Sequence, residues 1–167
     1  MYSIETHSSL PNVAFYQALN EQLNALLSSE RDLICNAAQF SAFIMQTLPD
    51  LNWAGFYFVR NNELVLGPYV GKVACTRIPF SRGVCGAAAR TQTTQRVDDV
   101  HAIADHIACD AASNAELVVP ILVEGNIKAV FDIDSPKTHR FSEDDQQGIE
   151  QLVNTFIQSC DWSWQLS

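Results

Sequence analysis

Cysteine is the residue type in this chain whose placement most strongly suggests chemistry. The sequence has five cysteines, an odd number, with no C-x-x-C and no paired His/Cys spacing typical of zinc sites. We therefore expect free thiols, with no structural disulfide framework and no structural metal. Three thiols fall in different contexts: Cys75 in an expected strand, Cys85 at a glycine-flanked turn and Cys109 in a long polar loop.

Thiol reactivity ranks these cysteines. Cysteine reacts as the thiolate, which partial exposure and a helix amino end favour, so Cys85 and Cys109 are the thiols we expect to be reachable. The alternative is that all five are small buried apolar residues, as free cysteines commonly are. We adopt that interpretation for Cys35 and Cys160, which fall on expected helices with no charged or catalytic residues patterned around them.

Two acids point to a ligand site. Asp132 and Asp134 alternate along a strand, so both should face one side of the sheet while Ile133 faces the other. Carboxylates at the end of an apolar strand are costly to bury unless they bind a donor, which indicates a ligand site on that face. The alternative is a solvated strand end.

A histidine lies close to one of the thiols in sequence. His106 and Cys109 could form a thiolate–imidazole couple or a pair of metal ligands. No third ligand accompanies them at metal spacing, so we favour a solvated or hydrogen-bonded histidine.

Three long helices are expected to frame the chain. Apolar residues recur three or four positions apart between residues 10 and 48, which predicts two amphipathic helices, the second stopped by Pro49. A C-terminal helix is expected over residues 142–160, because Ser142 and Asp145 form a start similar to a capping box.

The sheet and the site loops are expected over residues 51–135. The predicted strands are residues 52–60, 63–70, a short strand with Val73 and Cys75 on one face that ends at Pro79, then 117–123 and 127–133. Cys85 should lie near a helix start, and residues 91–114 form the longest irregular stretch. This order predicts an α+β fold, an antiparallel sheet with the helices gathered on one side.

Composition limits the partners. A chain of 167 residues with 47% hydrophobic and 17% charged residues fits one globular domain, residues 1–167. Its net charge of -9 should repel phosphate backbones and anionic lipid, so we expect neither a nucleic acid nor a membrane partner. The first residues lack the pattern of a signal peptide, and we expect a cytoplasmic protein.

Four motifs together resemble one enzyme family. They are Asn52–Tyr57 (NWAGFY), Gly83–Gly86 (GVCG), His106–Asn114 (HIACDAASN) and Asp132–Ser135 (DIDS). In these motifs the chain resembles the free methionine-(R)-sulfoxide reductases, which are stand-alone GAF domains. The resemblance is close over residues 51–142 and looser in the flanking helices.

The resemblance implies roles for three cysteines. Cys109 would attack the sulfur of free methionine sulfoxide, and Cys75 would resolve the resulting sulfenic acid as a disulfide, which thioredoxin would then reduce. Cys85 matches the third family cysteine, which could form an alternative disulfide or help to position the substrate. The resemblance implies no cofactor and no metal, and it leaves open whether the protein is a homodimer.

The resemblance also implies a substrate pocket. Its residues would be Trp53, Tyr57, Glu116, Asp132 and Asp134. The acids could accept hydrogen bonds from the substrate ammonium, and crowded carboxyls raise one another's pKa, so that one of them could protonate the departing oxygen. Two alternatives remain: a sensory GAF module, expected to be fused to an output domain, and a redox-sensing interaction protein without turnover.

Overall fold

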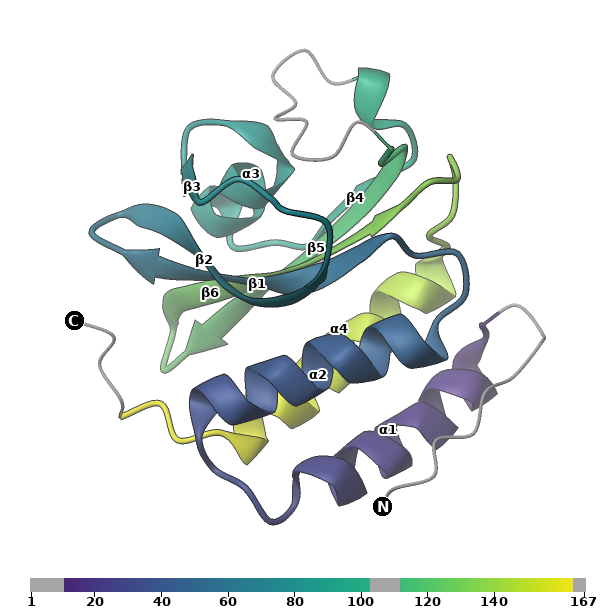
Figure 1. The fold of residues 1–167 in the computed structure, drawn as a ribbon, viewed down its shortest axis with the longest axis vertical. Coiled ribbons are helices and arrows are strands. Elements are labelled where there is room, and N and C mark those ends of the chain that lie inside the picture. Colours follow the sequence, from purple (N-terminus) through teal and green to yellow (C-terminus); the bar gives the residue numbers. More distant parts are fainter. Residues whose placement is uncertain (1–10, 103–111, 164–167) are drawn as a thin grey trace.

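A six-stranded antiparallel sheet forms the centre of the fold (Figure 1). The computed structural model describes residues 11–102 and 112–163. The strands follow the order β3-β2-β1-β6-β5-β4, so strands from the two halves of the chain meet at the centre. Their bounds are β1 Trp53–Arg60, β2 Glu63–Gly71, β3 Arg77–Pro79, β4 Gln95–Val97, β5 Ala115–Val123 and β6 Asn126–Ser135.

Three long helices cover one face of this sheet (Figure 1). They are α1 Val13–Leu27, α2 Leu33–Thr47 and α4 Glu143–Ser159. The predicted capping box is confirmed, since the Ser142 side chain accepts from the Asp145 amide and the Asp145 side chain accepts from the Ser142 amide. No helix within residues 11–102 and 112–163 has the length and apolar character needed to cross a membrane.

Aromatic rings fill the core between the sheet and these helices. Phe56 of β1 and Phe131 of β6 meet Phe40 of α2 and Phe156 of α4. Phe56 and Phe156 have ring centroids 4.7 Å apart, and so do Phe40 and Phe131. Such ring contacts stabilise the fold by more than the apolar area that they bury, and they fix the helix layer against the centre of the sheet.

A fourth helix lies on the opposite face, so the expectation that the helices gather on one side is wrong for it. This is α3, Gly83–Thr91, packed above the sheet beside β3 (Figure 1). Its small residues allow a close approach: a Cβ on Gly86 would lie 2.7 Å from the Pro79 carbonyl oxygen. A second buried cluster, which includes Val84, Ala88 and Val130, forms beneath it.

Two further sequence predictions are corrected by the structure. Val73 and Cys75 do not lie in a strand, because the carbonyls of Lys72 and Cys75 accept hydrogen bonds from aromatic side chains instead of a neighbouring strand. The stretch 91–114 is not wholly irregular, since β4 pairs with β5 and a 3-10 turn, η1, spans Val100–Ala102.

Candidate active site

Three adjacent strands bring the predicted pocket residues to one face of the sheet. In the strand register Trp53 lies opposite Asp134, and Asp134 lies opposite Glu116. Asp132 and Tyr57 point the same way as this row, because side chains two positions apart on a strand share a face. All five side chains therefore lie on the face covered by α3, and Ile133 packs among the helices on the other face as predicted.

Two carboxyl side chains are buried on this face, and a third is half-buried. Glu116 and Asp132 are each 6% exposed, and Asp134 is half-buried. Among the described residues, the Asp132 Oδ1 has no hydrogen-bond partner. A buried acceptor without a donor is costly to maintain, so the pocket is prepared to accept a hydrogen bond from a bound molecule.

Cys85 joins this acidic cluster. It is the third residue of α3, it is buried, and its thiol donates a hydrogen bond to Glu116 Oε1 at 3.9 Å. Burial and the adjacent Asp132 and Glu116 raise the pKa of Cys85 well above its ordinary value. The expectation that Cys85 is a reachable thiolate is therefore wrong, because burial and the acids outweigh the helix amino end.

The carboxyls resist ionisation for the same reasons. Burial, and then the charge of Asp134, raise the pKa of Glu116 well above its ordinary value. Burial, Asp134 and Glu116 do the same to the pKa of Asp132. Two carboxyls placed in this way cannot both ionise cheaply, so the pair favours keeping a proton.

The same cluster has the dimensions of a cation site. Ligand atoms of Cys85, Glu116 and Asp132 lie within 4.8 Å of one another. Thiols and carboxyls must lose their protons to ligate a metal, and these three have raised pKa values. The arrangement is better suited to holding and moving protons.

Stacked aromatic rings form the wall beside the acids. The Trp53 indole stacks on Tyr57, with centroids 5.9 Å apart, and on Tyr69, with centroids 5.2 Å apart. Tyr69 is not among the pocket residues expected from the sequence. The signal for it is Gly55, its partner across the strands, because a Cβ on Gly55 would lie 2.2 Å from the Tyr69 Cβ.

The remaining cysteines occupy different surroundings. Cys75 is half-buried and disulfide-bonded, so the expectation of free thiols is wrong for this residue. Cys35, Cys85 and Cys160 are free. Cys109 and His106 lie outside the described residues.

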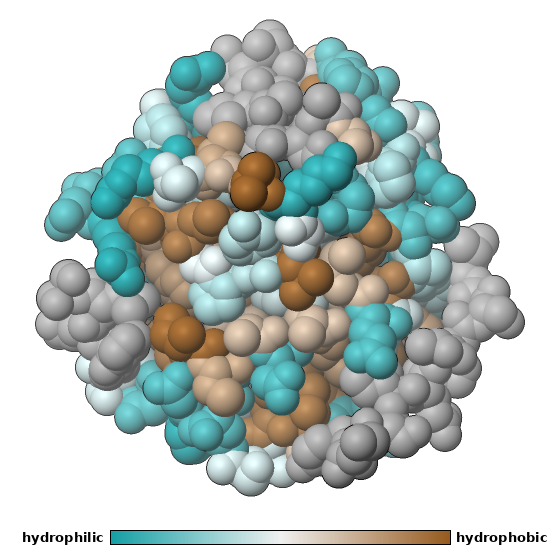
Figure 2. Space-filling model, in the orientation of Figure 1, coloured by the Kyte–Doolittle hydropathy of each residue, from teal (hydrophilic) through white to brown (hydrophobic). Residues whose placement is uncertain are grey.

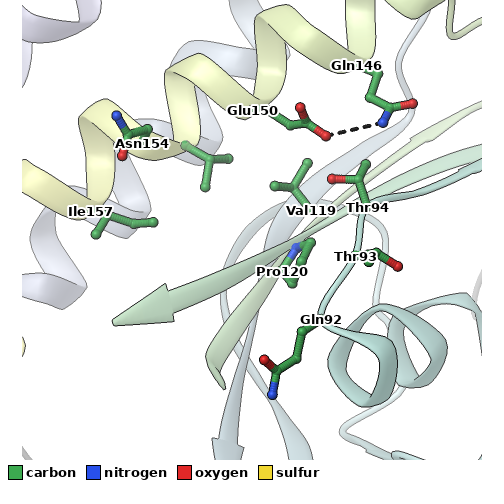
Figure 3. Close-up of a pocket in the computed structure, with 10 residues that line it drawn as sticks. Gln92, Thr93, Thr94, Val119, Pro120, Gln146, Glu150, Asn154 and Ile157 are labelled. Atoms are coloured by element: carbon green, nitrogen blue, oxygen red, sulfur yellow. Dashed lines mark hydrogen bonds between the residues drawn. The ribbon is translucent and has the colours of Figure 1, made fainter. Parts of the chain in front are cut away.

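A separate surface pocket lies between α4, β5 and the segment that follows α3 (Figure 3). It has a volume of about 480 Å³, and a hydrogen bond from Gln146 Nε2 to Glu150 Oε1, 3.2 Å, runs along its α4 wall. None of the predicted site residues lines it. Its amides and hydroxyls therefore make no contribution to the acidic cluster.

Known proteins share both the fold and much of the sequence. A family model described as GAF domain matches residues 36–157. A free methionine-R-sulfoxide reductase of Escherichia coli (strain K12) is 50% identical over 139 residues, which cover 83% of this chain and 84% of that protein. The chain belongs to the free methionine-R-sulfoxide reductase family.

Solved structures of free methionine-R-sulfoxide reductases superimpose closely on this chain. The enzyme from Neisseria meningitidis, in complex with its substrate, is 36% identical with a TM-score of 0.89 and covers 95% of both chains. The reduced form from Staphylococcus aureus is 41% identical with a TM-score of 0.85, and the match covers 89% of this chain and 96% of that one. The α+β GAF fold predicted from the sequence is confirmed.

Proposed function

We propose that this protein reduces free L-methionine (R)-S-oxide to L-methionine with cysteine thiols. The observation that carries the proposal is the convergence of three carboxyls and an aromatic wall on one buried face of the sheet. The relatives at 50% and 36% identity bear the name of this activity.

The pocket suits a small amino acid. The ammonium group would donate to the carboxyls of Glu116, Asp132 and Asp134, and the Asp132 Oδ1 has no other partner among the described residues. The Trp53 ring would contact the methyl end through sulfur and cation interactions. The substrate carboxylate would accept from amides in the first turn of α3, where the N-cap residue Arg82 makes no side-chain capping bond.

Cys109 would attack the sulfoxide sulfur as a thiolate. The sulfoxide oxygen must gain a proton as this bond forms, and the raised pKa of Glu116 and Asp132 keeps a proton available in the acidic cluster. Methionine then leaves, and the oxygen remains on Cys109 as a sulfenic acid. Attack by the Cys75 thiol forms the disulfide and releases water, so that one sulfoxide is reduced for two thiols oxidised.

The states of the other cysteines support this division of roles. Cys75 is disulfide-bonded and half-buried, as expected of a resolving residue. Cys85 has a raised pKa and donates to Glu116, so we assign it to the arrangement of the carboxyls and not to nucleophilic attack. Thioredoxin would return the disulfide to two thiols.

A coupled assay tests the function. Purified protein is mixed with each epimer of free methionine sulfoxide, thioredoxin, thioredoxin reductase and NADPH, and NADPH consumption is followed. We expect turnover of the R epimer alone. Consumption at background with both epimers would exclude the reductase and leave a ligand-binding sensory GAF module as the better interpretation.

Two variants test the residue assignments in the same assay. Cys109→Ser should abolish turnover, and Asp134→Asn should lower kcat/KM about tenfold or more by weakening substrate binding. Cys35→Ser is the matched control, since Cys35 is an exposed free thiol on α2 and should be dispensable. Full activity of Cys109→Ser would remove it from the mechanism, and an unchanged kcat/KM would remove Asp134 from the pocket.

A further inference from the structure

An exposed apolar side chain lies two residues from the disulfide. Val73 is 86% exposed, the highest value among the large apolar side chains of the described residues, and Val70 is 38% exposed. Cys75, which follows Val73 in the same segment, is disulfide-bonded. A single exposed valine is ordinary, so its neighbours decide whether it has a role.

The segment that carries Val73 is held firmly at both ends. Trp53 Nε1 donates to the Lys72 carbonyl at 3.2 Å, and Tyr57 Oη donates to the Cys75 carbonyl at 3.1 Å. Beyond them, the Leu66 amide donates to the Thr76 carbonyl at 3.0 Å. Val73 is therefore presented outward at a fixed position relative to the disulfide, which limits the entropy that a partner must remove on docking.

The charge of this part of the chain is opposite to that of the rest. Residues 64–97 contain five of the ten basic residues and none of the nineteen acidic residues, in a chain of net charge -9. All five basic residues are exposed: Lys72, Arg77, Arg82, Arg90 and Arg96. Arg77 pairs with Glu63 at 2.8 Å, and Lys72 adjoins Val73 directly.

Apolar and basic groups together match the anatomy of a protein interface. Interfaces place apolar residues at the centre and charged residues at the rim, where complementary charge speeds the encounter. In Figure 1 the segment after β2 crosses in front of the sheet, and in the same orientation Figure 2 shows brown apolar side chains at the surface among teal polar ones.

We propose that Val70, Lys72, Val73 and Arg77 form the docking surface for an acidic dithiol protein that reduces the Cys75 disulfide. We name this group of residues the reductant surface. The proposal rests on the proposed function in one respect, that the disulfide is the product of the catalytic cycle. The docking step itself needs no methionine sulfoxide.

The exchange on this surface balances in atoms and electrons. A thiolate of the docked protein attacks the Cys75 Sγ, the existing S–S bond breaks, and its electron pair leaves on the other cysteine, which takes up a proton. The second thiol of the docked protein then attacks the mixed disulfide and releases Cys75 as a thiol. The dithiol protein ends as the disulfide, and this chain gains two electrons and two protons.

A charge at Val73 provides the main test. Oxidised protein without methionine sulfoxide is mixed with reduced thioredoxin or with dithiothreitol, and the rate at which its disulfide opens is measured by thiol release. We expect Val73→Glu to slow the thioredoxin reaction about tenfold, the usual size for a buried contact residue, and to leave the dithiothreitol rate unchanged. The matched control is Val13→Glu, because Val13 is also an exposed valine but lies on α1. This variant should change neither rate.

Charge reversal at Lys72 provides a second, independent test. Lys72→Glu should slow the thioredoxin reaction at low ionic strength, and the difference should shrink at about 0.5 M salt, where charges are screened. Lys128→Glu, an exposed lysine near the start of β6, makes the same charge change away from the reductant surface.

Several results would overturn the proposal. Thioredoxin rates within about twofold of the unmodified protein for both Val73→Glu and Lys72→Glu would contradict it. An equal loss of the dithiothreitol rate would show that Val73 acts on the disulfide itself, and a change of oligomeric state in Val73→Glu by size-exclusion chromatography would assign the surface to a second copy of this chain. None of these measurements depends on reductase activity, so failure of the docking proposal can be distinguished from failure of the proposed function.

Discussion

The two faces of the central sheet are made by the same strands but have different roles. Along β6, Phe131 and Ile133 point to the three long helices, while Asp132 points to α3 and the acidic cluster. Along β1, Phe56 joins the aromatic core and Tyr57 forms the pocket wall. The alternation of strand side chains thus separates a stabilising face from a chemical face with no insertion between them.

The comparison teaches where stability comes from in this fold. The helix face buries apolar rings against one another, which favours folding. The pocket face buries a thiol and carboxyls with raised pKa values, which opposes folding and is retained for what the groups can do. Substitutions on the two faces should therefore change different quantities.

The largest effect is expected from removing a large aromatic side chain from the sheet face that packs against the three long helices. Phe56 is fully buried and its ring contacts Phe40, Phe131 and Phe156. Phe56→Ala should lower the free energy of unfolding by about 3–5 kcal/mol, measured by urea titration. Val13→Ala, at a half-exposed position, should stay within about 0.5 kcal/mol. A loss below about 1 kcal/mol for Phe56→Ala would mean that this face is not the stabilising one.

Two glycines offer a matched pair across the faces. A Cβ on Gly148 of α4 would lie 2.1 Å from the Tyr16 ring. One on Gly55 would lie 2.2 Å from the Tyr69 Cβ and 2.8 Å from the Trp53 indole. Gly148→Ala should destabilise the protein by about 1–3 kcal/mol and leave the KM for methionine sulfoxide unchanged. Gly55→Ala should raise that KM several-fold by displacing Tyr69 and the Trp53 indole stacked on it. Equal KM values in the two variants would break the distinction between the faces.

The smallest effect is expected from neutralising a carboxyl on the pocket face. Because the pKa of Asp132 is raised in the folded chain, the unfolded chain loses this proton first, and stability falls as the pH rises above about 4. Asp132→Asn cannot lose that proton. We expect the variant to be about 1 kcal/mol more stable than the unmodified protein at pH 8, with the two equal at pH 4, by urea titration at both pH values. If Asp132→Asn were less stable than the unmodified protein at pH 8, this would contradict a raised pKa for the buried Asp132 carboxyl.

Local pattern was enough to predict much of this molecule. The spacing of apolar residues predicted α1, α2 and α4 to within a few residues, and Ser142 with Asp145 predicted the start of the last helix. Alternation predicted that Asp132 and Asp134 share a face. These features depend on backbone period and on neighbours in the chain, which a sequence displays directly.

Local pattern failed where a neighbour distant in sequence decides the outcome. The strand expected from Val73 to Pro79 is shortened to β3, Arg77–Pro79, because Trp53 and Tyr57 bind the carbonyls of the segment before it. Tyr69 was overlooked because only strand pairing places it opposite Gly55.

The sequence by itself determined the family, the fold class and the periodic elements, since motif spacing and hydrophobic period are properties of the chain alone. Only the tertiary structure decided that Cys85 is a buried proton-holding neighbour of Glu116 and not an exposed thiolate. The physical reason is that a pKa depends on burial and on the charges nearby. Those surroundings are assembled from α3, β5 and β6, which meet only when the chain folds.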